Sequence, residues 1–156
     1  MFQNLIEKLN SLMASKGNPP VYISGPTKPE LIEKVEDRLK VKLPDDYKRF
    51  LLTYGIIGMG DDEVFGMNGT EDISQQMLVR ITEGNREEIN LPHSFIPINR
   101  SEYGDFICLN TGSVDNHRLV YYSSLDETFD SYPHANSFEE YLESYLKNYI
   151  LVNEKK

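Results

Sequence analysis

The feature that most constrains this fold is a pair of helical patterns that meet at Leu43-Pro44. Proline fixes its own φ and disfavours the helical conformation in the residue before it, so Leu43 must be extended. Pro44 suits the first turn of a second helix, and Gly55 supplies the left-handed residue that ends it. Two successive amphipathic helices are therefore predicted over residues 27–54. Their apolar faces consist of Leu31, Val35, Leu39, Tyr47, Phe50, Leu51 and Tyr54.

Further helices are predicted at both ends of the chain. Apolar residues between positions 2 and 13 recur at helical spacing. Thr27 and Glu30 predict a capping box for the helix before the proline junction, and Ser137 with Glu140 predicts one for a C-terminal helix. The tail from Val152 onward is expected to fray.

The second half of the chain predicts a sheet. Three short runs are rich in β-branched and aromatic residues and are separated by Gly, Asn and Asp, as in an antiparallel meander. These runs are residues 95–98, 105–109 and 119–123. Short strands are also expected at 21–23 and 64–65. Residues 76–81 are compatible with a strand or a short helix, and Thr82 is expected to cap a helix that follows.

These elements predict an α+β fold in a single domain that comprises residues 1–156, with a first helix in residues 1–16. We expect a mainly antiparallel, curved sheet of about five or six strands, flanked by N-terminal helices and a C-terminal helix. A chain of this length buries roughly 68 to 70% of its unfolded surface, which is enough for one core.

Composition points to a soluble protein of the cytoplasm. The chain is 39% hydrophobic and 26% charged, and no run approaches the roughly 20 apolar residues that span a bilayer. The first residues lack the basic start and unbroken apolar core of a signal peptide. Cys108 is the single cysteine and lies in an apolar run, so we expect a buried thiol and no disulfide framework. These features favour a reducing compartment.

The acidity of the chain is unevenly distributed. Residues 1–49 carry 9 Lys and Arg against 7 Asp and Glu, whereas residues 50–156 carry 7 against 18. Such a field repels nucleic acid and attracts basic partners. The simpler interpretation is a solvated acidic surface that aids solubility.

No motif in the sequence indicates catalysis. His93, His117 and His134 have no partner at a familiar metal-ligand spacing, and GxSxG is absent. Gly58 and Gly60 lack the third glycine of a nucleotide-binding loop. The acidic triplet at residues 61–63 could ligate a hard cation, but its spacing is not that of a calcium loop. We therefore expect a binding protein, without enzyme activity, metal or cofactor.

The order of motifs resembles the SUKH superfamily, in its yeast cell-wall-regulator-like branch, over about residues 27–146. The motifs in chain order are LPDDYKRFLLTYG, EVFG, FIPI, GDFICLN, LVYY and SFEEYL. A departure is that Gly55-Ile56-Ile57-Gly58 stands where the family has a double glycine. The resemblance implies an immunity protein that neutralises a cognate toxin, often a nuclease, by protein contact. The alternative that it implies is a regulatory or interaction module with a partner that is not a toxin.

We expect the partner-binding face to lie on acidic loops around the sheet. A nuclease toxin holds a polyanion with basic residues, so an acidic inhibitor would be steered to it. The expected contact residues are Asp61, Asp62 and Glu63 at the centre, Asp105 and Asp115 nearby, and Tyr103 and Tyr121 as aromatic anchors. Tyr121 and Tyr122 must point to opposite faces of a strand, so we expect one of them in the core. We expect no direct binding to nucleic acid or membrane, and the sequence leaves a homodimer open.

Overall fold

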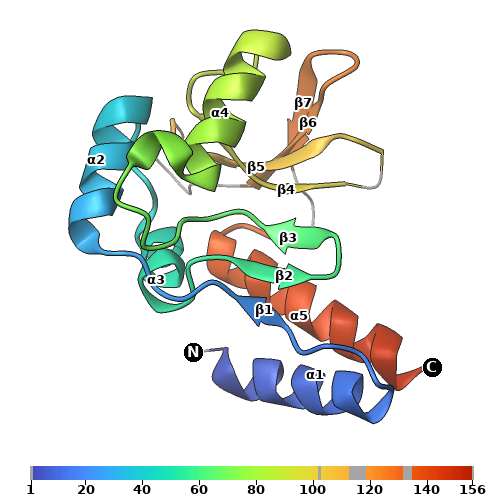
Figure 1. Cartoon of the computed structure of the whole chain (residues 1–156). Coiled ribbons are helices and arrows are strands. Elements are labelled where there is room, and N and C mark those ends of the chain that lie inside the picture. Colours follow the sequence, from blue (N-terminus) through green and yellow to red (C-terminus); the bar gives the residue numbers. More distant parts are fainter. Residues whose placement is uncertain (1, 102, 113–118, 132–134, 156) are drawn as a thin grey trace.

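A computed structural model describes residues 2–101, 103–112, 119–131 and 135–155. Helices dominate the first half of the chain and the C-terminus, and strands dominate the region between (Figure 1). The helices are α1 (Gln3–Ser15), α2 (Pro29–Leu39), α3 (Asp45–Thr53), α4 (Met77–Glu88) and α5 (Phe138–Glu154), with a 3₁₀ turn at Ile73–Gln75. The strands are β1 (Tyr22–Ile23), β2 (Ile57–Met59), β3 (Asp62–Val64), β4 (Phe95–Arg100), β5 (Phe106–Asn110), β6 (Leu119–Ser123) and β7 (Thr128–Ser131).

The strands form two antiparallel sheets, which confirms the α+β class. Strands β1-β2-β3 make a three-stranded sheet, and β4-β5-β6-β7 make a four-stranded one. We expected one sheet of five or six strands. Within the described residues, a single backbone hydrogen bond joins the two sheets: the amide of Phe65, just after β3, donates to the Ile98 carbonyl at 2.8 Å. A register shift between Pro97 and Asn99 leaves Ile98 out of the β4–β5 pairing, as in a β-bulge.

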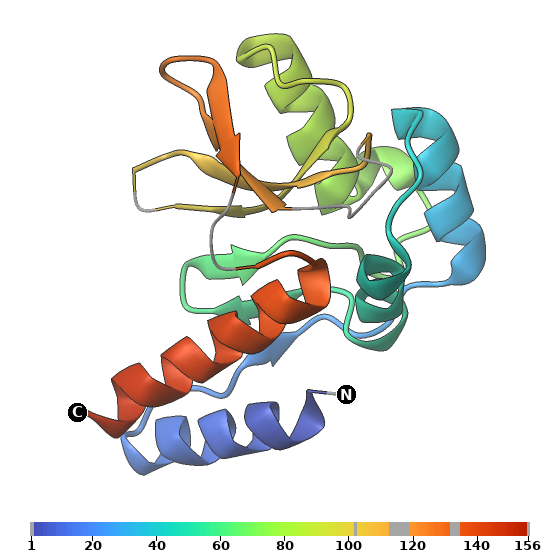
Figure 2. The same ribbon diagram turned by 180° about the vertical axis from the view of Figure 1, so that it is seen from behind.

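The four-stranded sheet is covered on both faces. On one face Phe106, Cys108 and Tyr122 form a cluster with Ile81 of α4, which confirms that Cys108 is buried. On the other face Ile107 and Leu109 join the main core, to which α1, α2, α3 and α5 contribute. Figure 2 shows α5 and α1 together on the far side of the three-stranded sheet from α4.

Helices α1 and α5 pack against each other, and their C-terminal ends lie close together (Figures 1 and 2). Lys8 pairs with Glu154 at 3.1 Å, and the Lys16 ammonium donates to the Asn153 carbonyl. These contacts lie at the C-terminal end of α5, which runs to Glu154. The expectation of fraying from Val152 was wrong, because contacts with α1 hold the last turn.

The proline junction is held by a buried carboxylate. Pro44 was expected in the first turn of α3, but it is the extended N-cap residue and the helix begins at Asp45. Glu36 of α2 is 5% exposed and accepts a hydrogen bond from the Leu43 amide at 2.8 Å. Its second contact is Lys48 at 3.3 Å. Since the Leu43 amide has no helical partner, this carboxylate satisfies a donor that would otherwise be buried unpaired.

A close backbone crossing fixes the start of the β2–β3 hairpin. Gly55 has φ +80°, which confirms its role as the left-handed stop of α3. A Cβ placed on Gly66 would lie 1.9 Å from the Gly55 carbonyl oxygen. The Tyr47 hydroxyl donates to the Phe65 carbonyl at 2.7 Å beside this crossing. The hairpin is therefore positioned by contacts with α3.

Two predicted caps were wrong and one was confirmed. Lys28 is the N-cap of α2, since Pro29 already occupies the first helical position and leaves Thr27 outside the helix. Thr82 lies buried in the middle of α4, which begins at Met77. Ser137 caps α5 and accepts from the Glu140 amide at 3.2 Å, as the sequence predicted.

Candidate functional site

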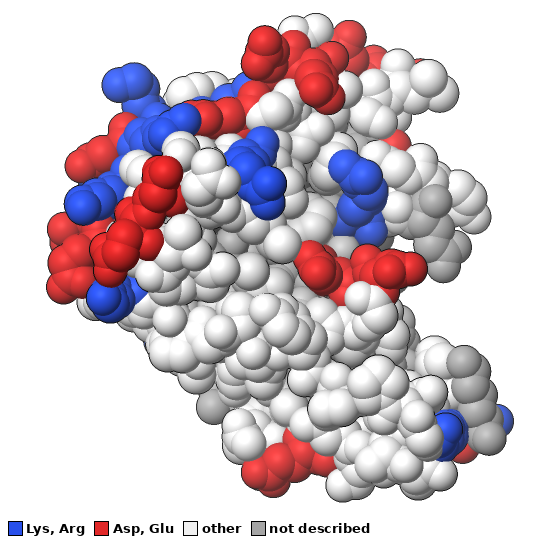
Figure 3. All heavy atoms as spheres, in the orientation of Figure 1, with Lys and Arg blue, Asp and Glu red and all other residues white. Residues whose placement is uncertain are grey.

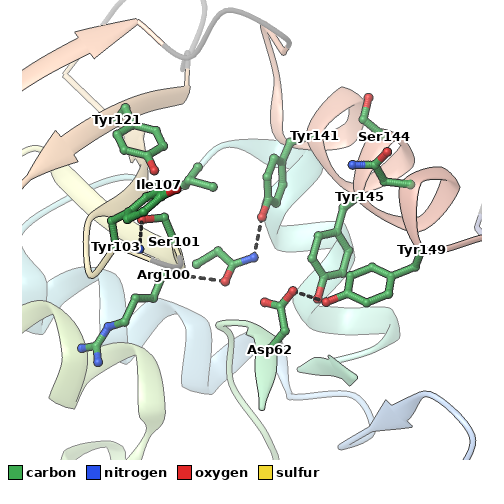
Figure 4. A pocket seen from close by; sticks show the side chains of 12 residues that line it. Asp62, Arg100, Ser101, Tyr103, Ile107, Tyr121, Tyr141, Ser144, Tyr145 and Tyr149 are labelled. Carbon is green, nitrogen blue, oxygen red and sulfur yellow. Dashed lines mark hydrogen bonds between the residues drawn. The ribbon is translucent and has the colours of Figure 1, made fainter. Parts of the chain in front are cut away.

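An open groove lies where α5 passes the β2–β3 hairpin and the strands β4, β5 and β6 (Figure 4). Its volume is about 650 Å³. Asp62 enters from the hairpin, and Ile107 and Tyr121 line the opposite wall from the four-stranded sheet. The groove therefore joins surfaces from both sheets and from the last helix.

One wall of the groove is a row of three tyrosines on α5, which we call the tyrosine ladder: Tyr141, Tyr145 and Tyr149. Residues four apart lie on the same face of a helix. The ring centroids of Tyr141 and Tyr145 are 6.0 Å apart, and those of Tyr145 and Tyr149 are 5.1 Å apart. These distances are those of direct aromatic packing. Tyr141 is buried at 3% exposure, whereas Tyr145 and Tyr149 are partly exposed to the groove.

The hydroxyls of the ladder reach two residues on neighbouring strands. Tyr149 donates to the Asp62 carboxylate, and the Asn99 amide donates to the Tyr141 hydroxyl at 2.7 Å (Figure 4). Asn99 follows the bulge of β4, and such irregularities commonly re-aim a side chain toward a site. Burial is the main cause that raises the pKa of Tyr145, and the charge of Asp62 adds to it. The Tyr145 phenol is thus neutral at physiological pH.

A second hollow of about 560 Å³ adjoins the groove on the other side of the hairpin. Asp61 and Glu63 line it, and Asp62, Asn99 and Arg100 are shared by both hollows. Figure 3 shows acidic side chains gathered over the tip of the β2–β3 hairpin, whereas Lys and Arg side chains are frequent over α2. The hairpin tip therefore presents negative charge between two concave surfaces.

The guanidinium of Arg100 does not face the tyrosine ladder. It lies over the ring of Phe106, 4.9 Å from the centroid, in a cation–π arrangement. Figure 4 shows the Arg100 side chain directed away from Tyr145 and Tyr149. Asp62 is consequently the charged group next to the ladder among the residues that line the groove.

The structure brings together most of the residues that the sequence analysis selected. Asp61, Asp62 and Glu63 lie on the hairpin, and Asp62 shares the groove with Tyr103 and Tyr121. Tyr103 is 86% exposed on the β4–β5 turn.

The other selected residues are not part of this arrangement. Asp105 lies on the same turn as Tyr103 but lines neither hollow; its amide donates to the Ser101 hydroxyl at 3.2 Å. Asp115 lies outside the described residues. Tyr122 is buried and donates to the Ile89 carbonyl at 2.7 Å, so it is the core member of the Tyr121-Tyr122 pair.

Sequence analysis missed the tyrosine ladder as part of a site. Tyr141, Tyr145 and Tyr149 recur at the spacing of an apolar stripe on the C-terminal helix, and that spacing by itself indicates packing residues. A signal was available, because a stripe of phenols at every fourth position carries hydroxyls that a core made of Leu or Phe would not. The roles of Asn99 and Arg100 had no signal, since they depend on the bulge in β4.

Other reactive groups do not assemble a site in the described part of the chain. No group of three or more His, Cys, Asp or Glu residues is placed there to hold a metal ion. Burial raises the pKa of the Cys108 thiol, which makes it a poor nucleophile. The His93 ring lies 3.2 Å from the Lys40 carbonyl, and His117 and His134 lie outside the described residues. None of the described helices is both long enough and apolar enough to cross a bilayer.

Comparison with protein families identifies the fold. A family model described as SMI1-KNR4 cell-wall (SUKH_6) matches residues 29–142, which is most of the chain. The chain belongs to the SUKH superfamily. The matched segment begins at α2 and ends within α5, so it contains the hairpin and the first rung of the tyrosine ladder but not α1.

A solved structure of similar fold supports the architecture. It is the crystal structure of a protein from Pseudomonas syringae pv. tomato, which superposes with a TM-score of 0.60 at 22% sequence identity. The similarity covers 93% of this chain and 98% of the other, so it extends beyond the segment that the family model matches. No curated protein matches this SUKH chain significantly.

Proposed function

We propose that this chain is an immunity protein of the cytoplasm, which binds a toxin protein and blocks it by contact. Membership of the SUKH superfamily supports this proposal, because that superfamily includes immunity proteins. The geometry that supports it best is the placement of Asp61, Asp62 and Glu63 on one hairpin, between two open hollows. A partner can therefore meet negative charge and concave shape at the same place.

We further propose that the toxin is a nuclease with a basic active surface. An enzyme that cleaves nucleic acid must attract phosphates, and an acidic protein is attracted to the same surface. The excess of acidic residues in 50–156 includes the hairpin and supports this choice. The inhibitor then occupies the surface that the substrate needs.

A second candidate is an interaction module whose partner is not a toxin. The matching family model carries a cell-wall description, which favours a regulatory partner. The two candidates differ in one observable property, since only an immunity protein protects a cell from a toxin.

Co-expression tests the proposal. A toxin-like domain encoded next to this chain would be expressed from a tightly regulated promoter, with and without the chain. Surviving colonies would be counted in both cases. We expect the wild-type chain to restore growth. A variant with Asp61→Asn, Asp62→Asn and Glu63→Gln should protect less well, whereas Asp126→Asn on the β6–β7 turn is a matched control. Continued killing despite soluble wild-type chain would overturn the proposal for that toxin.

A further inference from the structure

The groove beside α5 combines an aromatic wall with one carboxylate. The rings of the tyrosine ladder pack against one another, edge-on between Tyr145 and Tyr149 and tilted between Tyr141 and Tyr145, with centroids 5.1 and 6.0 Å apart. Asp62 lies at the end of the ladder and is held there by the Tyr149 hydroxyl (Figure 4). Ile107 and Tyr121 close the opposite side. A ligand in this groove would meet apolar faces along its length and a negative charge near one end.

This combination suits a long cationic side chain. Ring faces attract a cation through their quadrupole, and the attraction grows when water is excluded. The methylene groups of arginine or lysine can lie along apolar surface while the charged head reaches a carboxylate. A guanidinium can also stack flat on a phenol ring while it donates to the carboxylate.

The positive charge nearest the groove is placed so that it does not prevent such binding. Arg100 has its guanidinium over Phe106 and directed away from the ladder. The neighbouring acidic residues Asp61 and Glu63 add negative potential from the other side of the hairpin. An anionic ligand would meet these three carboxylates, so the charge balance disfavours it.

We propose that this groove binds an arginine or lysine side chain of the partner protein, with the cation at the Asp62 carboxylate and the methylene groups along the tyrosine ladder. The inference rests on the proposed function in taking that partner to be a basic protein. It deepens the proposal by naming the part of the partner that enters the groove. It also assigns a binding role to three tyrosines of α5.

Small amides of single amino acids test the groove without any toxin. Full-length chain with labelled tyrosine rings would be titrated with N-acetyl-arginine amide and N-acetyl-lysine amide, and ring chemical shifts followed by NMR. N-acetyl-citrulline amide is the matched neutral control for arginine, because it has nearly the same shape. N-acetyl-norleucine amide serves the same purpose for lysine.

We expect saturable shifts at Tyr141, Tyr145 and Tyr149 with one or both cationic amides, and none with the neutral controls. Asp62→Asn keeps an acceptor for the Tyr149 hydroxyl but removes the charge, so affinity should fall about five- to tenfold. Asp126→Asn, on the exposed β6–β7 turn and outside both hollows, should change affinity less than about twofold. If Asp62→Asn does not fold, Tyr145→Leu tests the aromatic wall instead, with the same loss expected.

The inference is overturned if neither cationic amide gives saturable shifts at the ladder, if citrulline and arginine behave alike, or if the groove variant binds as the wild type does. The outcome is separate from that of the co-expression experiment. If the chain binds arginine but gives no protection, the proposed cation site stands and the proposed toxin partner is wrong. If the chain protects but binds no cationic amide, the proposed immunity function stands and only the proposed cation site is wrong.

Discussion

The Tyr149 hydroxyl on α5 donates a hydrogen bond to the Asp62 carboxylate on β3, 87 residues earlier in the chain. This contact connects the last helix to the acidic hairpin, and it fixes one carboxylate at the end of the tyrosine ladder. Binding surface and scaffold therefore share a residue. A partner that contacts Asp62 also contacts the structure that holds α5 in place.

Removing the Tyr149 hydroxyl should destabilise the fold slightly. Tyr149→Phe keeps the ring and loses one partly buried hydrogen bond to a charged acceptor, so we expect a loss of about 1 kcal/mol in the free energy of unfolding. Tyr22→Phe is the control, because Tyr22 is exposed on the edge strand β1 and should change stability by less than about 0.5 kcal/mol. Urea denaturation measures both, and equal midpoints would contradict the role given to this contact.

A methyl group at Gly66 should be far more damaging. Its Cβ would lie 1.9 Å from the Gly55 carbonyl oxygen, and the crossing backbones cannot separate without moving the hairpin. We expect Gly66→Ala to cost at least about 3 kcal/mol or to prevent folding. Gly84→Ala, in open space on α4, should instead stabilise the protein by about 0.5 to 1 kcal/mol. A Gly66→Ala protein that melts with the wild type would show that the crossing is not tight.

The Glu36 carboxylate should be needed at the proline junction. Glu36→Ala leaves the Leu43 amide buried without its acceptor and removes the pairing with Lys48, so we expect a loss of about 2 to 3 kcal/mol. Glu36→Gln retains an acceptor and should lose less. Asp37→Ala, at the exposed neighbouring position, is the control. Thermal unfolding should give the lowest midpoint for Glu36→Ala, a higher one for Glu36→Gln and the highest for Asp37→Ala. A Glu36→Ala protein as stable as the control would contradict the role of this carboxylate at the junction.

Stability should decline in alkaline solution because Tyr47 is buried. Burial raises the pKa of Tyr47 above its ordinary value of 10.0 in the folded chain. Above that pH the unfolded chain loses the phenol proton and the folded chain keeps it, so each further pH unit favours unfolding by about 1.4 kcal/mol. Below pH 10.0 this contribution to stability is fully present.

Lysine side chains also lose protons at alkaline pH. Substitution of Tyr47 separates its contribution to the loss of stability from theirs. Tyr47→Phe removes the titrating group, so its urea midpoint should fall less between pH 9 and pH 11 than that of the wild type. The lower starting stability of the variant, which lacks the bond to the Phe65 carbonyl, does not affect this slope. Tyr103→Phe, at an exposed site, should keep the wild-type slope; a Tyr47→Phe slope equal to it would contradict the prediction.

Much of the fold could be predicted where a local rule leaves one solution. Gly55 was expected to be the left-handed residue that ends α3, and this is observed. Proline was expected to mark the start of that helix, and it does, although Pro44 is the extended N-cap and not a first-turn residue. Ser137 capped α5 as expected because its hydroxyl and the Glu140 amide are three residues apart in one turn. At Thr27 the same rule failed, since Pro29 set the start of α2 first.

Features that depend on contacts between distant segments could not be predicted. The strands form two sheets, and the link between them depends on the bulge at Ile98, whose carbonyl accepts from the amide of Phe65, the residue after β3. Strand β7 was missed because it is a short, polar edge strand that is recognised only by its pairing with β6. Of the candidate site, the acidic hairpin could be predicted from charge, whereas the tyrosine ladder became a wall of the groove only when Asp62 was placed beside it.

The most direct test of the account is inhibition of a purified toxin domain by the purified chain. The measurement is the rate of DNA or RNA cleavage by the toxin-like domain as the chain is added. The account predicts that cleavage falls in proportion to added chain and stops near about one molar equivalent, as for tight one-to-one binding. An unchanged cleavage rate in about tenfold molar excess of folded chain, at a concentration well above the dissociation constant of a tight complex, would contradict it.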